Sequence, residues 1–334
     1  YRDNVTARYG SEAAWADAEL ERLPGWGYNT LGAWSDTDTF ASRMPYTLLL
    51  GVTGSDFATG RMQDLWEPAW SDGVESTVAA AAAAHGDDPM LVGYWFDNEL
   101  HWGPDWRPLH LFDEYLAMPA AAPGKVALLA WLQDRYPTFA AFAADITTSA
   151  HDWAELAAPT TASAWTRSGG EATRAGWVGQ IAERYYAVTD AALERLEPDH
   201  LNLGARMIAQ VTGTPVLDAA ARHVDVISLN TYTIDAALVP GLAGADPTYL
   251  PVTGPLAAQA ARTGKPLLVS EWGFRAADSG LPNTWPPLFP TLKPQQERAA
   301  ASEAFELGLL PNTSVVGQHI FEWADEPAAG RFDG

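Results

Sequence analysis

Seven short apolar runs recur along the chain at strand length, and this feature limits the possible folds more than any other. Most of the runs are continuously apolar rather than alternating, which is typical of strands buried on both faces of a parallel sheet. The runs are "YNTLGAW" (28–34), "YTLLLGV" (46–52), "LVGYWFD" (91–97), "LNLGARM" (201–207), "DVISLNTY" (225–232), "KPLLVSEW" (265–272) and "VVGQHIFEW" (315–323). The sequence therefore predicts a parallel α/β fold.

Stretches with helical spacing lie between these runs, and Gly or Pro near their ends supplies the stops. No Gly-rich phosphate loop follows any run, so a barrel fits better than a doubly wound sheet. A (β/α)8 TIM barrel needs eight strands, and we expect its first strand to be missing from this chain, upstream of Tyr1. We expect helices over 11–23, 73–85, 124–135, 171–196, 215–222, 255–263 and 294–309.

The composition shows no break that would divide the chain, and 334 residues suit one large domain. We expect residues 1–334 to form a single catalytic barrel domain. The segment at about 107–170 is too long for a simple strand-to-helix link, so we expect an insertion over the barrel mouth. Because Tyr1 is not a methionine and no leader precedes it, we expect a chain that was processed or cut from something longer.

Charge and composition exclude several functions. A net charge of −22 repels nucleic acid and anionic membrane surfaces, so we expect neither as a partner. Cysteine is absent, which excludes thiolate nucleophiles, disulfides and Cys-ligated zinc. The histidines do not fall at metal-ligand spacings and the serines lack a G-x-S-x-G elbow, so we predict neither a metal site nor a serine hydrolase.

Polar residues close several runs, and the carboxyl ends of barrel strands carry the chemistry. Glu99, Glu271 and Glu322 each follow or end a different apolar run. Two glutamates on non-adjacent strands that face one mouth are what glycosidic bond hydrolysis requires. Further candidates at these ends are Asn98, Arg206, Asn230 and Tyr232.

A single glutamate at a strand end is more often a rim residue or an ion-pair partner than a catalyst. The convergence of "DNE", "SEWG" and "FEWADEP" after three runs favours a catalytic site. The two carboxyl groups need different surroundings: crowding by carboxylates and aromatic faces favours the protonated form, and donors such as Arg206 and Tyr232 favour the ionised form.

Several of the 15 tryptophans stand beside these carboxylates. Flat indoles at a mouth stack on the apolar faces of sugar rings. Most tryptophans are core residues, and we assign Trp26, Trp131 and Trp177 to that class. We expect Trp34, Trp102, Trp272 and Trp323, together with Glu322, to contact substrate.

Taken together, these motifs resemble clan A glycoside hydrolases and, more narrowly, glycoside hydrolase family 50, the β-agarases. The resemblance covers nearly the whole chain, and "GY-x-x-DNE-x-x-WG" is its most specific part. The matching segments are "WGYNTLGAWSD" (26–36), "MPYTLLLG" (44–51), "LWEPAWSDGV" (65–74), "VGYWFDNELHWG" (92–103), "HLNLGARM" (200–207), "SEWGF" (270–274) and "FEWADEPAAGRFDG" (321–334).

The resemblance implies a role for each matching residue. Glu99 would be the acid/base and Glu271 the nucleophile. Asn98 would bind the sugar hydroxyl next to the scissile bond, Tyr232 would orient Glu271, and Arg206 would hold the ionised carboxylate. The family retains configuration, for which the two carboxyl groups lie roughly 5 to 5.5 Å apart. The family's first barrel strand and the amino-terminal carbohydrate-binding-type domain common in agarases are absent from this sequence.

We therefore predict a retaining hydrolase of β-linkages in a neutral galactan, with agarose or an agaro-oligosaccharide as substrate. Agarose is uncharged, which suits an acidic protein better than a sulfated chain would. Two alternatives stay open: another clan A β-glycosidase of the β-galactosidase kind, and a carbohydrate-binding barrel without activity. We expect no cofactor and a secreted or periplasmic location. The sequence makes no prediction of oligomeric state, of exo or endo cleavage, or of a structural calcium.

Overall fold

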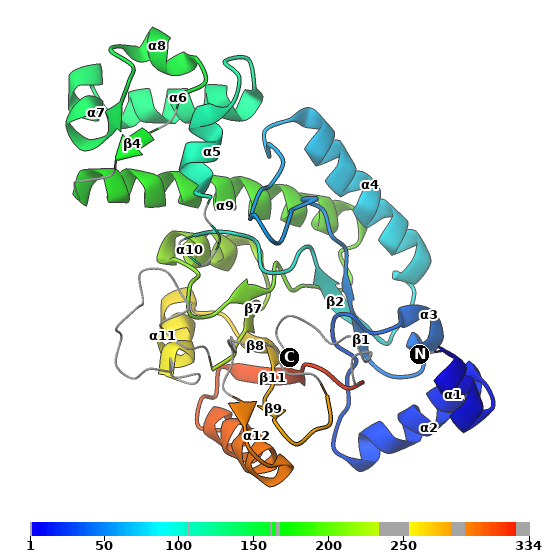
Figure 1. The fold of residues 1–334 in the computed structure, drawn as a ribbon. Helices are drawn as coiled ribbons and strands as arrows, with labels where there is room; N and C mark the ends of the chain where they lie inside the picture. The colour runs from blue at the N-terminus through cyan, green and yellow to red at the C-terminus, as the bar shows by residue number, and fades with distance from the viewer. Residues whose placement is uncertain are drawn as a thin grey trace.

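The computed structural model shows a mixed α/β protein with parallel strands at its centre and helices around them (Figure 1). The structure describes residues 2–103, 105, 107, 109–160, 162–164, 168–233, 254–281 and 291–324. The predicted parallel α/β class is confirmed.

Two parallel sheets carry most of the strands. The first has the order β1-β2-β5 and the second the order β11-β8-β7-β6. Every strand in them runs parallel to its neighbours, and six of the seven apolar runs supply them. Their bounds are β1 (Tyr46–Leu49), β2 (Leu91–Trp95), β5 (Leu201–Asn202), β6 (Met207–Ile208), β7 (Ile227–Asn230), β8 (Leu267–Trp272) and β11 (Val315–Ile320).

Isolated bridges extend this strand order. Asn98 bridges in parallel to Arg206, and β5 and β6 belong to one apolar run, so the two sheets are linked. Leu31 bridges in parallel to Tyr46, which places residues 28–34 beside β1. We expected a full strand there, but the structure forms a single bridge. Within the part of the chain that the structure describes, this segment has a neighbouring strand on one side only.

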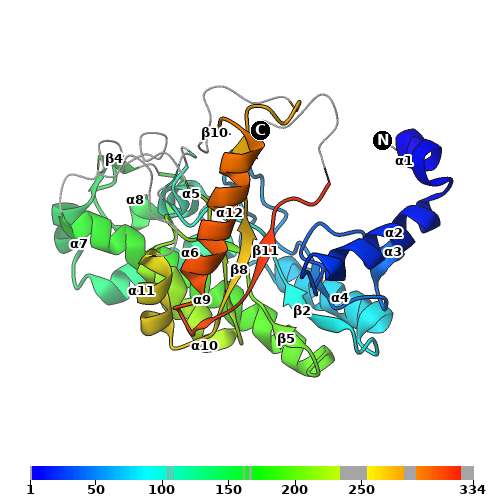
Figure 2. The ribbon, with the colours of Figure 1, turned by 90° about the horizontal axis from the view of Figure 1, so that it is seen from below.

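The seven expected helices are present, with bounds shifted by five residues at most, at the start of α4. Proline stands in the first turn of α4, α6 and α10, where its missing N–H costs no hydrogen bond. Figures 1 and 2 show α4, α9, α10, α11 and α12 around the outside of the strands. None of the helices within the described ranges is long and apolar enough to cross a bilayer. The helix bounds are α2 (Glu12–Gly25), α4 (Pro68–His85), α6 (Pro123–Arg135), α9 (Ser168–Leu196), α10 (Thr214–His223), α11 (Gly254–Thr263) and α12 (Gln295–Leu309).

Shorter elements add to this frame. Two helices, α1 (Arg2–Tyr9) and α3 (Thr37–Phe40), were not predicted, and β9 (Arg275–Ala276) pairs with β10 (Thr291–Leu292) beyond β8. Between β2 and α9 the chain forms a helical subdomain that packs on α9 (Figure 1). Its position over a barrel mouth stays a prediction. Its elements are α5 (Leu111–Ala117), α6, α7 (Phe139–Asp145), β3 (Thr147–Thr148), α8 (Trp153–Ala157) and β4 (Ala162–Ala164).

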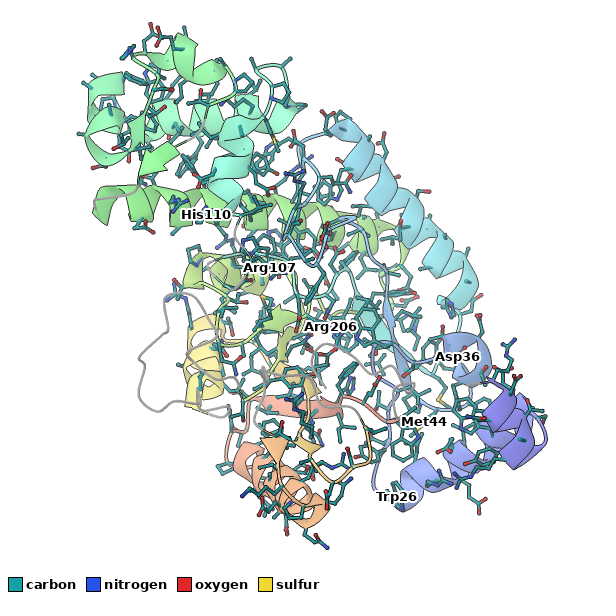
Figure 3. All side chains as sticks on the ribbon, viewed as in Figure 1. Trp26, Asp36, Met44, Arg107, His110 and Arg206 are labelled. Atoms are coloured by element: carbon teal, nitrogen blue, oxygen red, sulfur yellow. The ribbon has the colours of Figure 1, made fainter. Side chains whose placement is uncertain are left out.

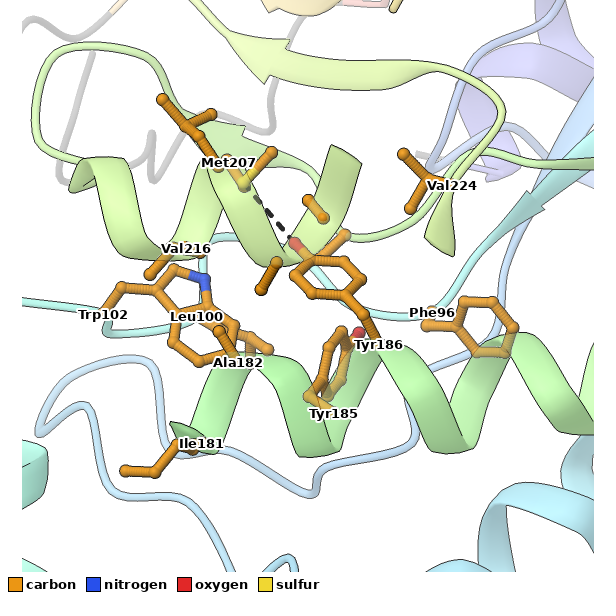
Figure 4. Close-up of a cluster of buried hydrophobic side chains, with 14 of the residues drawn as sticks. Phe96, Leu100, Trp102, Ile181, Ala182, Tyr185, Tyr186, Met207, Val216 and Val224 are labelled. Atoms are coloured by element: carbon orange, nitrogen blue, oxygen red, sulfur yellow. Dashed lines mark hydrogen bonds between the residues drawn. The ribbon is translucent and has the colours of Figure 1, made fainter. Parts of the chain in front are cut away.

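An aromatic cluster joins α9 to the strands (Figure 4). Tyr185 and Tyr186 on α9 are buried, and the Trp102 ring stacks on Tyr186 at a centroid distance of 6.4 Å. The Tyr186 hydroxyl lies 3.4 Å from the sulfur of Met207 at the start of β6. This packing fixes the long helix behind the strand ends that carry the candidate site.

The core assignments of three tryptophans have different outcomes. Trp177 is 1% exposed, as expected, and Trp131 is partly buried against it at 5.6 Å. The assignment of Trp26 to the core was wrong, because its side chain is 67% exposed. It follows the end of α2 and contacts Arg22 and Trp323 at the surface.

Candidate active site

Five side chains from neighbouring strand ends form one hydrogen-bonded network around two glutamates. Arg206 donates to Asn98 Oδ1 at 2.9 Å and to Glu271 Oε1 at 2.7 Å. Asn230 donates to the same Asn98 oxygen at 3.1 Å and to Glu99 Oε1 at 2.9 Å. The structure thus brings together the predicted catalytic pair and three of the predicted substrate ligands.

Strand register explains why residues so far apart in sequence meet here. The strands are parallel, so their carboxyl ends lie at one edge, and Asn230 is paired directly with Glu271 between β7 and β8. Asn98 and Glu99 follow β2, and Arg206 stands at the start of β6 beside them. Figure 3 shows Arg206 near the centre of the molecule, among the strands.

Three donors surround the carboxylate of Glu271. Arg206 and the indole N–H of Trp34 donate to Oε1, the latter at 3.0 Å, and the hydroxyl of Tyr232 donates to Oε2 at 2.8 Å. Burial and the charge of Glu271 raise the pKa of Tyr232 well above its usual value, so this hydroxyl keeps its proton. These hydrogen bonds fix the orientation of the carboxylate, which a nucleophile needs.

Glu99 has different surroundings. Part of its side chain remains accessible, but protein encloses the carboxyl group, which accepts a hydrogen bond from Asn230. This desolvation, and next the negative charge of Glu271, raise the pKa of Glu99 to about 7, against the opposing effects of Asn230, Arg206 and Arg107. A carboxyl group with such a pKa can donate a proton near neutral pH.

Arg206 is 1% exposed, and its positive charge is compensated from several sides. One amino group also donates to the Ser270 carbonyl at 2.8 Å. Its guanidinium carbon lies 5.2 Å from the centre of the Trp95 ring and 5.7 Å from that of Trp34, so aromatic faces and Glu271 together stabilise the buried cation.

The four tryptophans expected to contact substrate divide into two pairs. Trp34 is 59% exposed next to Glu271, and Trp323 is partly buried against the rings of Trp26 and Tyr28. Trp102 and Trp272 are corrections, because they are 3% and 2% exposed and present no face to a substrate. Successive residues of a strand point to opposite sides, so Glu271 in β8 faces the site and Trp272 packs on Phe305 of α12. Trp102 instead packs on α9.

A cavity of about 430 Å³ opens beside Glu271. Residues 28–36 form one wall and residues 318–324 the other, so the cavity lies between the two ends of the strand order. Glu322 and Trp323 line it, and the Trp323 indole donates to Glu19 at 3.0 Å. These two predicted ligands therefore lie on the open side of the site.

Sequence reasoning gave no role to Asp97, although it directly precedes Asn98. Its carboxylate accepts hydrogen bonds from the backbone of Val52 and Thr53 and from the Tyr185 hydroxyl. Burial raises its pKa to about 6 despite these donors. Asp97 thus connects the loop after β1 to α9. Its position directly before Asn98 and Glu99 in the sequence could have indicated a residue that supports the site.

Within the described ranges, no group of three or more His, Asp or Glu side chains is arranged to hold a metal ion. Trp106 and Asp325, which also stand near the carboxylates in sequence, lie outside the described residues.

Two curated relatives match nearly all of this chain. β-Agarase A and β-agarase B of Vibrio sp. (strain JT0107) are 28% and 25% identical to it over 99% of its length. The chain spans about a third of these relatives, namely 34% and 35%. No protein-family model matches.

Solved structures agree with these relatives. The structure of an agarase, AgWH50C, is 26% identical to this chain and superposes on it with a TM-score of 0.80. The superposition covers 99% of this chain and 47% of AgWH50C. The chain is thus similar to β-agarases in sequence and to an agarase in fold. Two further structures, PfGH50B and an exo-β-agarase, share the fold of this chain. Each is 24% identical to this chain. PfGH50B has a TM-score of 0.80 and covers 98% of this chain over 47% of its own length. The exo-β-agarase has a TM-score of 0.78 and covers 96% of this chain over 43% of its own length.

Proposed function

We propose that this protein hydrolyses β-glycosidic linkages of agarose or agaro-oligosaccharides with retention of configuration. One observation carries the proposal: two glutamates in one hydrogen-bonded network have opposite surroundings, with three donors on Glu271 and an enclosed carboxyl of raised pKa at Glu99. The agarase relatives supply the substrate class.

The chemistry proceeds in two steps. A Glu271 oxygen attacks the anomeric carbon while Glu99 gives its proton to the leaving glycosidic oxygen, so the C–O bond to the leaving sugar breaks as the bond to Glu271 forms. Glu99, now ionised, then takes a proton from water, whose oxygen displaces Glu271 from the same carbon. This double displacement requires carboxyl groups roughly 5 to 5.5 Å apart.

The remaining predicted ligands would hold the sugar. Arg206 and Asn230 both donate to Asn98 Oδ1, which fixes the orientation of this amide and directs its NH₂ group to a sugar hydroxyl. The exposed ring of Trp34 offers an apolar face for stacking beside Glu271. Glu322 and Trp323 would contact a sugar that extends into the cavity.

We also propose that the strands form one (β/α)8 TIM barrel domain over residues 1–334, of clan A type. Two observations support this: the strands follow one another in chain order from residue 31 to β11, and both end segments line the 430 Å³ cavity. Because agarose is a long polymer, the protein would act at or beyond the cell surface, as a secreted or periplasmic enzyme.

The test is product analysis with agarose, neoagaro-oligosaccharides, aryl β-galactosides and other β-glycans, using wild type, Glu99→Gln and Glu271→Gln. The proposal expects agaro-oligosaccharide products from wild type and none from Glu271→Gln. Cleavage of aryl galactosides alone would replace the substrate class. Absence of products from every glycan would contradict catalysis and favour a carbohydrate-binding role.

A further inference from the structure

The backbone at Glu99 adopts a conformation that residues with side chains rarely take. Its φ is 47°, in the left-handed region, which such residues enter only where their surroundings hold them. Two hydrogen bonds do so here. The Glu99 N–H donates to the Arg206 carbonyl at 2.8 Å, and the Glu99 carbonyl accepts from Arg107 Nη1 at 2.8 Å. The direction of the Glu99 carboxyl therefore depends on Arg107.

Arg107 is itself held in a buried cluster with Asp105 and His101, which are 4%, 3% and 1% exposed. The Arg107 side chain donates to the Asp105 carboxylate, with Nε at 3.0 Å from Oδ2, and the Arg107 backbone N–H donates to Oδ1 at 2.8 Å. His101 Nδ1 lies 3.0 Å from Asp105 Oδ2, and its Nε2 meets the Leu109 carbonyl. Asp105 thus holds the guanidinium by Nε and Nη2, and Nη1 donates to the Glu99 carbonyl.

The Asp105 carboxylate of this cluster favours its ionised form. Burial alone would raise the pKa of Asp105, but the hydrogen bonds from His101 and Arg107 outweigh it and lower that pKa to about 2. The ring of Phe57 lies 5.5 Å from the Arg107 guanidinium carbon, on the loop that packs against His101. Figure 3 places Arg107 between Arg206 and His110, at the junction of the strands and the helical subdomain.

Four charged or titratable groups act on the Glu99 carboxyl from the elements around it. Glu271 on β8 and burial disfavour its ionised form, whereas Arg206 at β6 and Arg107 in the loop after β2 favour it. Tyr232, after β7, is the fourth group. Arg107 therefore affects Glu99 in two ways, through the backbone and through charge.

We propose that Arg107 is a positioning residue for the acid/base: its bond to the Glu99 carbonyl aims the carboxyl group at the glycosidic oxygen, and its charge favours the ionised form needed in the second step. This inference rests on the proposed role of Glu99. Arg107 contacts the backbone carbonyl of Glu99, so its effect on the reaction would be transmitted through Glu99.

Two variants separate the two effects. Arg107→Met removes the bond and the charge, and we expect at least about a tenfold loss of kcat on agaro-oligosaccharides, because a misdirected general acid loses part of its 10²- to 10⁴-fold contribution. The loss should be much smaller on an aryl glycoside whose leaving group needs no proton. The alkaline limb of kcat/KM should also move to higher pH. Arg107→Lys keeps the charge, so it should lower kcat without moving that limb.

Arg174→Met is the matched control, because it removes an arginine paired with Asp113 on α5, away from Glu99. It should leave the leaving-group dependence and the pH profile unchanged. Thermal unfolding of each variant separates loss of fold from loss of positioning. If Arg107→Met does not fold, Arg107→Lys alone decides the kcat and leaving-group tests.

A titration of ¹³C-labelled glutamate carboxyls by NMR, assigned with Glu99→Gln, tests the inference without turnover. Arg107→Met should raise the titration midpoint of Glu99, and Arg174→Met should not. An inactive wild type would overturn the proposed hydrolysis but leave this readout valid. Unchanged leaving-group dependence together with an unchanged Glu99 midpoint in Arg107→Met would overturn the inference.

Discussion

Glu99 and Glu271 are the same residue type at the same edge of the strands, yet their surroundings are opposite. Glu271 lies within a regular strand and accepts hydrogen bonds from Arg206, Trp34 and Tyr232. Glu99 follows its strand on a left-handed backbone, accepts from Asn230, and has a pKa raised to about 7. The comparison teaches that their surroundings, rather than the residue type, distinguish the two glutamates, and the roles that we propose for them rest on this difference.

The largest effect should come from Glu271→Gln. The amide keeps the size of the side chain but cannot attack the anomeric carbon, so hydrolysis of agarose and of aryl glycosides should both fall by about 10⁴-fold or more. Initial rates on both substrates measure this. Glu183→Gln, at a surface ion pair with Arg222, should match wild type. Substantial activity of Glu271→Gln would remove the asymmetry between the two glutamates.

Glu99→Gln should be nearly as damaging on natural substrates but not on activated ones. Loss of a general acid costs about 10²- to 10⁴-fold when the leaving group needs a proton. With a dinitrophenyl glycoside, the first step should survive, and a burst of released phenol followed by slow turnover should appear in stopped-flow traces. Equal losses on both substrates would mean that Glu99 does not act as the acid.

The pH profile should show the same asymmetry. Glu99 acts first in its protonated form, and its folded pKa of about 7 lies above the usual value for glutamate. Activity should therefore be lost as pH rises through about 7, by about tenfold per unit. Measured kcat/KM across the neutral range tests this. A plateau extending well into the alkaline range would contradict it.

Tyr232→Phe should have an intermediate effect, because it removes one of three donors to Glu271. A hydrogen bond to a charged group contributes about 1.5–3 kcal/mol, so kcat/KM should fall by about tenfold to a hundredfold. Tyr136→Phe is the matched control, because it removes a hydroxyl that donates to a carboxylate, that of Asp145, at 3.0 Å in the helical subdomain. An unaltered rate in Tyr232→Phe would show that the Arg206 bond alone prepares the nucleophile.

Trp34→Phe should have the smallest effect. It keeps an aromatic face for the sugar and removes the N–H bond to Glu271. Because the Trp34 ring is 59% exposed, this bond contributes little, and kcat should fall by less than about tenfold. Trp34→Ala should raise KM as well, because the stacking face is lost. If both variants changed KM alone, the indole N–H would have no part in preparing Glu271.

The sequence predicted the parallel strands, the helices and the two glutamates, because all depend on local apolar runs and on the residues directly after them. Their mutual contacts depend on register, which brings Asn230 opposite Glu271 and Arg206 beside Asn98. No local pattern contains that information.

Burial of single tryptophans was the least predictable feature. Proximity to a carboxylate in sequence suggested a site residue, but strand alternation turns Trp272 outward from Glu271, and the chain folds Trp102 back onto α9. The role of Arg107 was equally hidden, because it is eight residues from Glu99 in an irregular loop. Such contacts arise from tertiary packing and not from periodicity.

Azide rescue tests the central claim, the division of roles between the two glutamates, most directly. Azide added to Glu271→Gly with an activated aryl β-galactoside should replace the missing nucleophile and give the α-glycosyl azide. Azide added to Glu99→Ala should attack the covalent intermediate and give the β-glycosyl azide. These two products, identified by NMR, are the result we predict. The opposite pairing of variant and product, or the same anomer from both, would contradict the account.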